Sequence, residues 1–169
     1  MDSERLLARE RQPGNDQTFR VSEGNFVQTA RSCLDPAKYV IDPQPRVLAD
    51  VFATVDETPL AVIPEVMIRS RETGRMLFVE VKKQGPRGNA EERSYKHHTV
   101  QFYKTLKDRL GYDFHPFVTI WCESLATDPR YTRKAKYLFE EGHYFLWVNY
   151  DPTSLCSWLR ARCEEWLDD

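Results

Sequence analysis

Residues 61–82 read AVIPEVMIRSRETGRMLFVEVK, two apolar and partly alternating runs on either side of the loop 71–74. Runs of this kind around a short loop that contains glycine predict a β-hairpin. If the turn is centred between Glu72 and Thr73, paired residue numbers add up to 145 and Glu65 lies opposite Glu80. Directly opposed residues have Cβ atoms about 4.5–5.5 Å apart. The hairpin therefore predicts two neighbouring carboxylates.

The second run ends in Glu80-Val81-Lys82. Alternate residues of a strand share a face, so Glu80 and Lys82 leave one face together. Two carboxylates this close repel each other unless a cation lies between them, and their oxygens are ligands that Mg²⁺ prefers. We therefore expect Glu65 and Glu80 to bind a divalent metal and Lys82 to position a water for attack.

Two other interpretations of these residues stay open. A surface strand often alternates Glu and Lys as a simple salt bridge, which would explain the triplet by itself. A register slip of one residue would place Glu65 on the wrong face of the hairpin. In that case Asp50 or Asp56 is the alternative second metal ligand.

The rest of the chain predicts an α/β fold. The length of 169 residues suits one domain over 1–169, with the polar residues 1–20 as an arm or a frayed helix. Helices are expected over 23–34 with Ser22 as N-cap, and over 90–110, 133–141 and 152–166, while strands are expected over 116–122 and 143–148. Residues 39–41 read as a short apolar piece in a loop, and 46–55 are ambiguous between strand and helix. This order of elements predicts a mixed central β-sheet flanked by helices.

Charge is distributed unevenly along the chain. The net charge is only −2, yet residues 82–109 hold eight cations and three acids, which gives this stretch +5 and a local positive field. The four cysteines form no CxxC pair, and no apolar run is long enough to span a bilayer. We expect a cytoplasmic protein with reduced thiols and no membrane partner.

The acid after a proline, Pro64-Glu65, followed by Glu80-Val81-Lys82 on the next strand, resembles the motif of the PD-(D/E)xK nuclease superfamily. The resemblance implies a restriction-endonuclease-like core and a metal-dependent cut in a phosphodiester. It also implies that the backbone carbonyl of Val81 is a third metal ligand. This chain departs from the family pattern, because Glu65 stands where an aspartate is usual.

A longer match follows along the chain. Residues 79–85 read VEVKKQG and residues 88–96 read GNAEERSYK, and together they resemble the catalytic strand and the base-reading segment of EcoRI-like type II restriction endonucleases. The resemblance covers roughly residues 60–100 and assigns DNA recognition to Asn89, Ala90, Glu92 and Arg93. It assigns a DNA-backbone contact to Lys96, and Lys83 and Arg87 are further candidates for phosphate contacts. The stretch between Lys82 and the GNA segment is much shorter than in the family, so we expect the DNA-embracing arms to be absent or built from another segment, such as the N-terminus.

The recognition segment has a chemical logic of its own. Arginine donates two hydrogen bonds to guanine O6 and N7, asparagine pairs with adenine N6 and N7, and glutamate accepts from exocyclic amines. The alternative is purely structural, because Asn89 as N-cap and Glu92 at the third helical position resemble a capping box.

We therefore expect a DNA endonuclease that uses Mg²⁺, for which Mn²⁺ substitutes, and that acts as a homodimer on double-stranded DNA in a bacterial or phage-infected cell. The resemblance also implies a preference for an A·T-rich centre. The alternatives are a less specific phage, repair or mobile-element nuclease of the same fold, and a DNA-binding module that kept the fold without catalysis.

Overall fold

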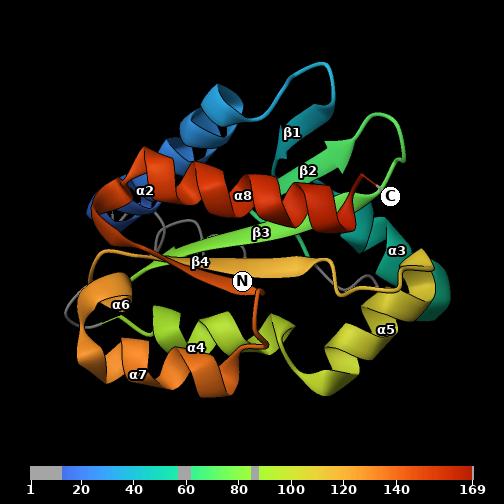
Figure 1. Ribbon diagram of the computed structural model, residues 1–169. Coiled ribbons are helices and arrows are strands. Elements are labelled where there is room, and N and C mark those ends of the chain that lie inside the picture. The colour runs from blue at the N-terminus through green and yellow to red at the C-terminus, as the bar shows by residue number, and fades with distance from the viewer. Residues whose placement is uncertain (1–12, 57–61, 85–87, 169) are drawn as a thin grey trace.

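The computed structural model describes residues 13–56, 62–84 and 88–168, and a five-stranded sheet in the order β1-β2-β3-β4-β5 lies at its centre (Figure 1). Strand β2 runs antiparallel to both of its neighbours, β1 and β3, whereas β3, β4 and β5 run parallel to one another. The strands are β1 Tyr39–Pro43, β2 Val66–Ser70, β3 Met76–Lys83, β4 Phe117–Cys122 and β5 Tyr144–Trp147. The predicted α/β fold with a mixed sheet is confirmed.

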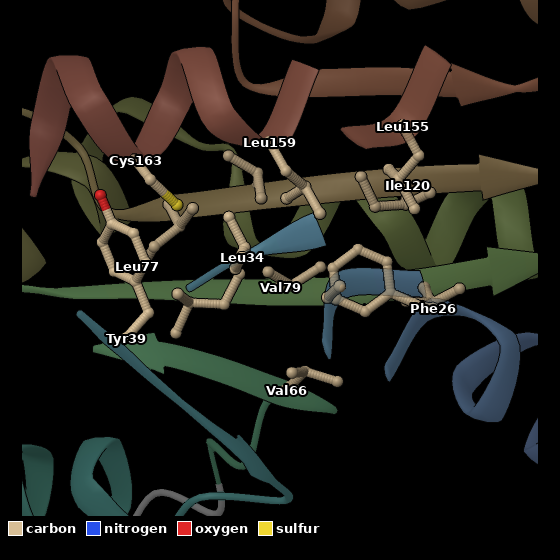
Figure 2. Packing of buried hydrophobic residues seen from close by; sticks show 14 of the residues in the cluster. Phe26, Leu34, Tyr39, Val66, Leu77, Val79, Ile120, Leu155, Leu159 and Cys163 are labelled. Atoms are coloured by element: carbon tan, nitrogen blue, oxygen red, sulfur yellow. The ribbon is translucent and has the colours of Figure 1, made fainter. Parts of the chain in front are cut away.

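Helices cover both faces of this sheet (Figure 1). One face carries α2 (Pro13–Cys33) and α8 (Pro152–Trp166), and Figure 2 shows Leu155 and Leu159 of α8 lying over Ile120 of β4. The other face carries α3 (Val47–Asp56), α4 (Ala90–Ser94), α5 (Val100–Leu110) and α7 (Pro129–Leu138). The short helix α6 (Ser124–Thr127) follows β4. Within the described ranges, no helix combines the length and apolar character that a bilayer span needs.

The hairpin register is the one that the sequence predicts. The pairs Val66↔Val79, Met67↔Phe78, Ile68↔Leu77 and Arg69↔Met76 all add up to 145. Strand β3 continues past this hairpin, because its residues from Phe78 to Lys83 pair with β4 on the other side. From Glu80 onward, the residues of β3 have no paired residue in β2, and the two strands diverge as a fork.

The structure contradicts two of the sequence-based expectations and resolves a third that was ambiguous. Helix α2 begins at Pro13, so Ser22 is not an N-cap; it lies buried within the helix, with its hydroxyl 2.7 Å from the Tyr150 hydroxyl. The apolar piece at residues 39–41 is not a loop but the edge strand β1, and residues 47–56 are helical. Pairing with β2 stabilises β1, and local sequence does not carry this information.

The long helix expected over 90–110 is broken. Helix α4 ends at Ser94, a 3₁₀ turn (η1) follows over Tyr95–His97, and α5 starts afresh at Val100. Thr99 causes the break, since its side chain accepts a hydrogen bond from the Phe102 N–H and caps α5. Gly111 ends α5 with a φ of 70°, so the expected helix end at residue 110 is confirmed.

Candidate active site and DNA-reading segment

Three charged side chains meet at the fork between β2 and β3. Glu65 directly precedes β2, and its Oε2 accepts a hydrogen bond of 2.5 Å from the Val81 N–H. The Lys82 Nζ lies 3.4 Å from Glu65 Oε1 and 2.9 Å from Glu80 Oε2. The structure thus brings together the two acids and the lysine that the sequence singled out.

The backbone of β3 explains why Glu65 fits there. The Phe78 N–H donates to the Pro116 carbonyl on the β4 side of β3. Successive residues of a strand direct their backbone groups to opposite sides, so those of Val81 face the β2 side. Because β2 no longer pairs at this level, the carboxylate of Glu65 takes the place of a strand partner.

Burial gives this corner unusual electrostatics. Burial raises the pKa of Glu65 to about 8, and the like charge of Glu80 adds to the shift. For Lys82, burial alone would lower the pKa, but the carboxylates of Glu80 and Glu65 outweigh it and the pKa is raised. Lys82 therefore remains an ammonium, shared by two acids that compete for a single positive charge. A further cation placed here would relieve that competition.

The chemistry of the donors fits a hard cation. Among the residues that the structure describes, no three His, Cys, Asp or Glu side chains gather as a metal-binding group. A metal bound at the fork would therefore have two carboxylate ligands and would need backbone oxygen and water to complete its coordination, as Mg²⁺ sites commonly do. The alternative ligand Asp50 lies exposed on α3, and the side chain of Asp56 lies outside the described ones.

The residues expected to read DNA lie on the outer side of α4. Asn89, Glu92, Arg93 and Lys96 are exposed, whereas Ala90 and Ser94 are buried. Arg93 is close enough to Lys82 for its charge to influence the pKa of that lysine. The segment thus lies near the candidate catalytic corner formed by Glu65, Glu80 and Lys82, with polar and charged groups on its solvent side.

The structural alternative for this segment is wrong in its details. Asn89 occupies the N-cap position of α4, but its side chain makes no capping hydrogen bond. The Glu91 N–H instead donates to Gln84 Oε1 at 2.9 Å. Asn89 and Glu92 are therefore not a capping box, which leaves their exposed side chains available for other contacts.

The predicted phosphate contacts have different surroundings. Lys83 is only 12% exposed and lies 3.4 Å from Glu123, so a contact with phosphate would compete with an existing ion pair. Lys96 is exposed on η1. Arg87 lies outside the described residues.

Two polar residues near the fork had no role in the sequence-based interpretation. The charge of Glu23 on α2 adds, after burial and Glu80, to the raised pKa of Glu65. Gln84 belongs to the quoted VEVKKQG motif, yet only the structure reveals its partners. Glu23 had no local signal at all, because it approaches the fork from a helix more than 40 residues upstream.

A mixed sheet with two acids and a lysine at such a fork defines a class of protein, the nucleases of the PD-(D/E)xK superfamily, which are metal-dependent. Comparison with known proteins narrows this class. The family model of the type II restriction enzyme MunI matches residues 4–168. The curated MunI sequence from Mycoplasma sp is 24% identical over 180 residues, covering 87% of this chain and 89% of that protein.

The solved structures include a match as well. The crystal structure of MunI restriction endonuclease in complex with cognate DNA has a TM-score of 0.64 and 25% sequence identity, and the match covers 78% of this chain and 83% of that one. The chain belongs to the MunI family of type II restriction enzymes. It is a sequence-specific DNA endonuclease, and of the three functions that the sequence left open, the restriction-type one is confirmed.

Proposed function

We propose that Glu65, Glu80 and Lys82 are the catalytic residues with which this chain hydrolyses phosphodiester bonds of double-stranded DNA in the presence of Mg²⁺. The observation that carries this proposal is the meeting of both carboxylates at the Lys82 ammonium, 3.4 and 2.9 Å from its nitrogen. An ordinary surface salt bridge would be exposed and would need one acid, whereas Glu80 is 5% exposed and a second acid adjoins it. A buried acid and a partly buried acid beside one lysine are costly for stability and are therefore typical of a functional site.

The metal ligands would be Glu65, Glu80 and the backbone carbonyl of Val81. The Val81 N–H points toward Glu65, and in a strand the carbonyl of a residue points to the same side as its N–H. Glu65 is preferred to Asp50 because Glu65 contacts both Val81 and Lys82. When bound, Mg²⁺, or Mn²⁺ in its place, lowers the pKa of a water and neutralises charge on the scissile phosphate.

Lys82 has two tasks in this scheme. As an ammonium held by two carboxylates, it donates hydrogen bonds that orient the attacking water toward phosphorus. It also stabilises the negative charge that develops on the phosphate oxygens as the bond to the leaving oxygen breaks. Its partly buried position strengthens both effects, because water screens them less.

The proposal also covers the contacts with double-stranded DNA and the assembly of the protein. Asn89, Ala90, Glu92 and Arg93 would read base edges in the major groove, while Lys96, Lys83 and Arg87 would contact phosphates. We further propose a homodimer on a palindromic site with an A·T-rich centre, since protein symmetry and site symmetry match in such complexes. All four cysteines are free, as expected for the cytoplasm of a bacterial or phage-infected cell.

The first test is digestion of plasmid DNA by the purified chain. We expect discrete fragments with Mg²⁺, similar fragments with Mn²⁺ and no cutting in EDTA, and sequencing of the ends gives the recognition site. A smear would favour a less specific nuclease, and intact plasmid under all metal conditions would favour a non-catalytic DNA-binding module.

Arg93→Lys tests the reading segment. Lysine keeps the positive charge but cannot match the two-pronged arginine contact with guanine, which contributes about 1–3 kcal/mol of discrimination. We expect preference for the cognate site over single-base variants of it to fall about 5- to 150-fold, the range to which that energy corresponds. Competition binding with labelled duplexes measures this ratio.

Arg130→Lys is the matched control, because Arg130 is an exposed arginine of α7 paired with Asp128. Equal loss of preference in both variants, or none in Arg93→Lys, would argue against base reading by Arg93.

A further inference from the structure

Helix α4 has too little apolar surface to hold itself in place. It spans five residues, and Ala90 is its one buried hydrophobic side chain. An isolated helix of this length is unstable in water, because nucleation fixes several residues for a single hydrogen bond. Polar contacts with neighbouring elements must therefore set its orientation.

Gln84 provides the contact at the start of α4. Its Oε1 accepts from the Glu91 N–H at 2.9 Å, and its Nε2 donates to the Tyr131 hydroxyl on α7 at 2.6 Å. The backbone of Gln84 is fixed as well, since its carbonyl accepts a 2.9 Å hydrogen bond from the Ser124 hydroxyl of α6. Gln84 thus supplies the N-terminal acceptor that Asn89 does not supply.

Two side chains of α4, Glu91 and Ser94, make further contacts that hold its inner side. Glu91 Oε1 accepts from the Tyr95 hydroxyl at 2.9 Å and lies 3.0 Å from Lys134 Nζ on α7. The Ser94 hydroxyl accepts from the Trp121 indole N–H of β4 at 2.9 Å. Glu91 is therefore engaged by the protein, while Glu92 and Arg93 on either side of this anchored face are exposed.

Gln84 is also directly connected to the catalytic strand. It follows the last residue of β3 and lies two residues after Lys82. The side chain of Gln84 is bonded to α4, and its backbone directly follows the strand end that carries Lys82. The connection between the two sites is therefore short and consists of polar contacts.

We propose that Gln84 is a positioning residue that couples base reading by α4 to catalysis at Lys82, so that an incorrect sequence is cut slowly because the catalytic corner is misaligned. This inference rests on the proposed function, which places base reading on α4 and catalysis at the fork. The role of Gln84 is to hold both in one geometry, without contact with the reacting atoms.

The test compares Gln84→Met, which keeps the size of the side chain but loses both hydrogen bonds, with Tyr131→Phe, which removes one of them. Gln101→Met is the matched control, since Gln101 is an exposed glutamine of α5. Each protein digests a plasmid library that carries a randomised eight-base-pair insert, with Mg²⁺, and sequenced ends give the cleavage rate at the best sequence and at its single-base variants. Steady-state kinetics on a duplex with the best sequence give kcat and KM.

We expect Gln84→Met to lose at least about tenfold in the ratio of cognate to variant cleavage, with kcat falling more than KM rises. Tyr131→Phe should change both quantities in the same direction but less, and Gln101→Met should match the parent. A parental ratio and kcat in Gln84→Met would overturn the inference while leaving the proposed function intact. A uniform loss at all sequences would also overturn it, because it would mean only that less protein is folded. An inactive parent would instead overturn the proposed function, and the coupling with it.

Discussion

Replacing Glu80 by glutamine is expected to lower the rate of DNA cleavage by at least about 1000-fold, because a metal-bound centre contributes several kcal/mol and each 1.36 kcal/mol corresponds to a factor of ten. Glutamine keeps the shape of the side chain but removes a charged ligand from the corner where Glu65 and Lys82 meet. The fold should persist, since a buried carboxamide is easier to desolvate than a buried carboxylate. Single-turnover cleavage of a duplex that carries the recognition site measures the rate.

Binding separates a catalytic role from a structural one. DNA affinity of Glu80→Gln, measured by fluorescence anisotropy in EDTA, should equal or exceed that of the parent, because one negative charge near the phosphates is gone. Glu72→Gln, an exposed position in the β2–β3 turn, is the matched control and should cut at the parental rate. Parental cleavage by Glu80→Gln would remove Glu80 from the active site, and loss of binding together with cleavage would indicate misfolding.

The second large effect concerns acid pH. All four histidines lie close together where η1 and α5 pack on the sheet, and the rings of His98, His115 and His143 are near neighbours. Burial lowers the pKa of His97 and His98 to about 3 and that of His115 to about 2, and it lowers the pKa of His143 as well. The rings are therefore neutral in the folded protein at pH values where they are charged in the unfolded chain.

The direction of the pH effect follows from these pKa values. An unfolded histidine has a pKa of about 6.5, so below that pH the unfolded state binds more protons and stability falls. His97, His98 and His115 each contribute a loss of about 1 kcal/mol between pH 6.5 and 5.5, and His143 adds to the loss in the same direction. Glu65 opposes the effect, since its pKa of about 8 means that the folded protein already holds that proton. We expect a net loss of at least about 2 kcal/mol over this interval, a large part of a typical stability of about 5–15 kcal/mol.

Urea denaturation in EDTA at pH 6.5 and 5.5 measures this loss. His143→Gln is a useful companion, because it removes one titrating ring but keeps a donor for the Phe117 carbonyl that His143 Nδ1 contacts at 3.2 Å. The stability of this variant should depend less steeply on pH than that of the parent, because one titrating ring is absent. A parent equally stable at both pH values, or imidazole NMR signals that titrate near pH 6.5, would contradict the neutral buried cluster.

The β2–β3 hairpin is a feature that nearby residues in the sequence suffice to predict. Strand alternation and a turn centred between Glu72 and Thr73 predicted the register that the structure shows, and this register places Glu65 beside Glu80. Helix α8 also begins at Pro152 and ends at Trp166 as predicted, since Asp151 caps it and proline is favoured in the first turn. These features depend on neighbours in the sequence, and for that reason the sequence reveals them.

The break at Thr99 and the edge strand β1 are features that local sequence did not predict. Helical periodicity continues through residues 90–110. Helix α4, however, is held by the contact of Gln84 with the Glu91 N–H and by that of Ser94 with Trp121 of β4. Helix α5 then starts separately after its cap, Thr99. Strand β1 has only five residues and is a strand because β2 pairs with it.

The sequence by itself predicted the mixed α/β fold, the hairpin register and the meeting of Glu65, Glu80 and Lys82, because alternation and turn chemistry act over a few residues. Tertiary structure alone decided that Glu23 influences the corner, that Lys83 pairs with Glu123 and that Gln84 anchors α4. Those contacts join residues that are distant in the chain or whose partners depend on how helices pack on the sheet, and no local pattern encodes such a meeting.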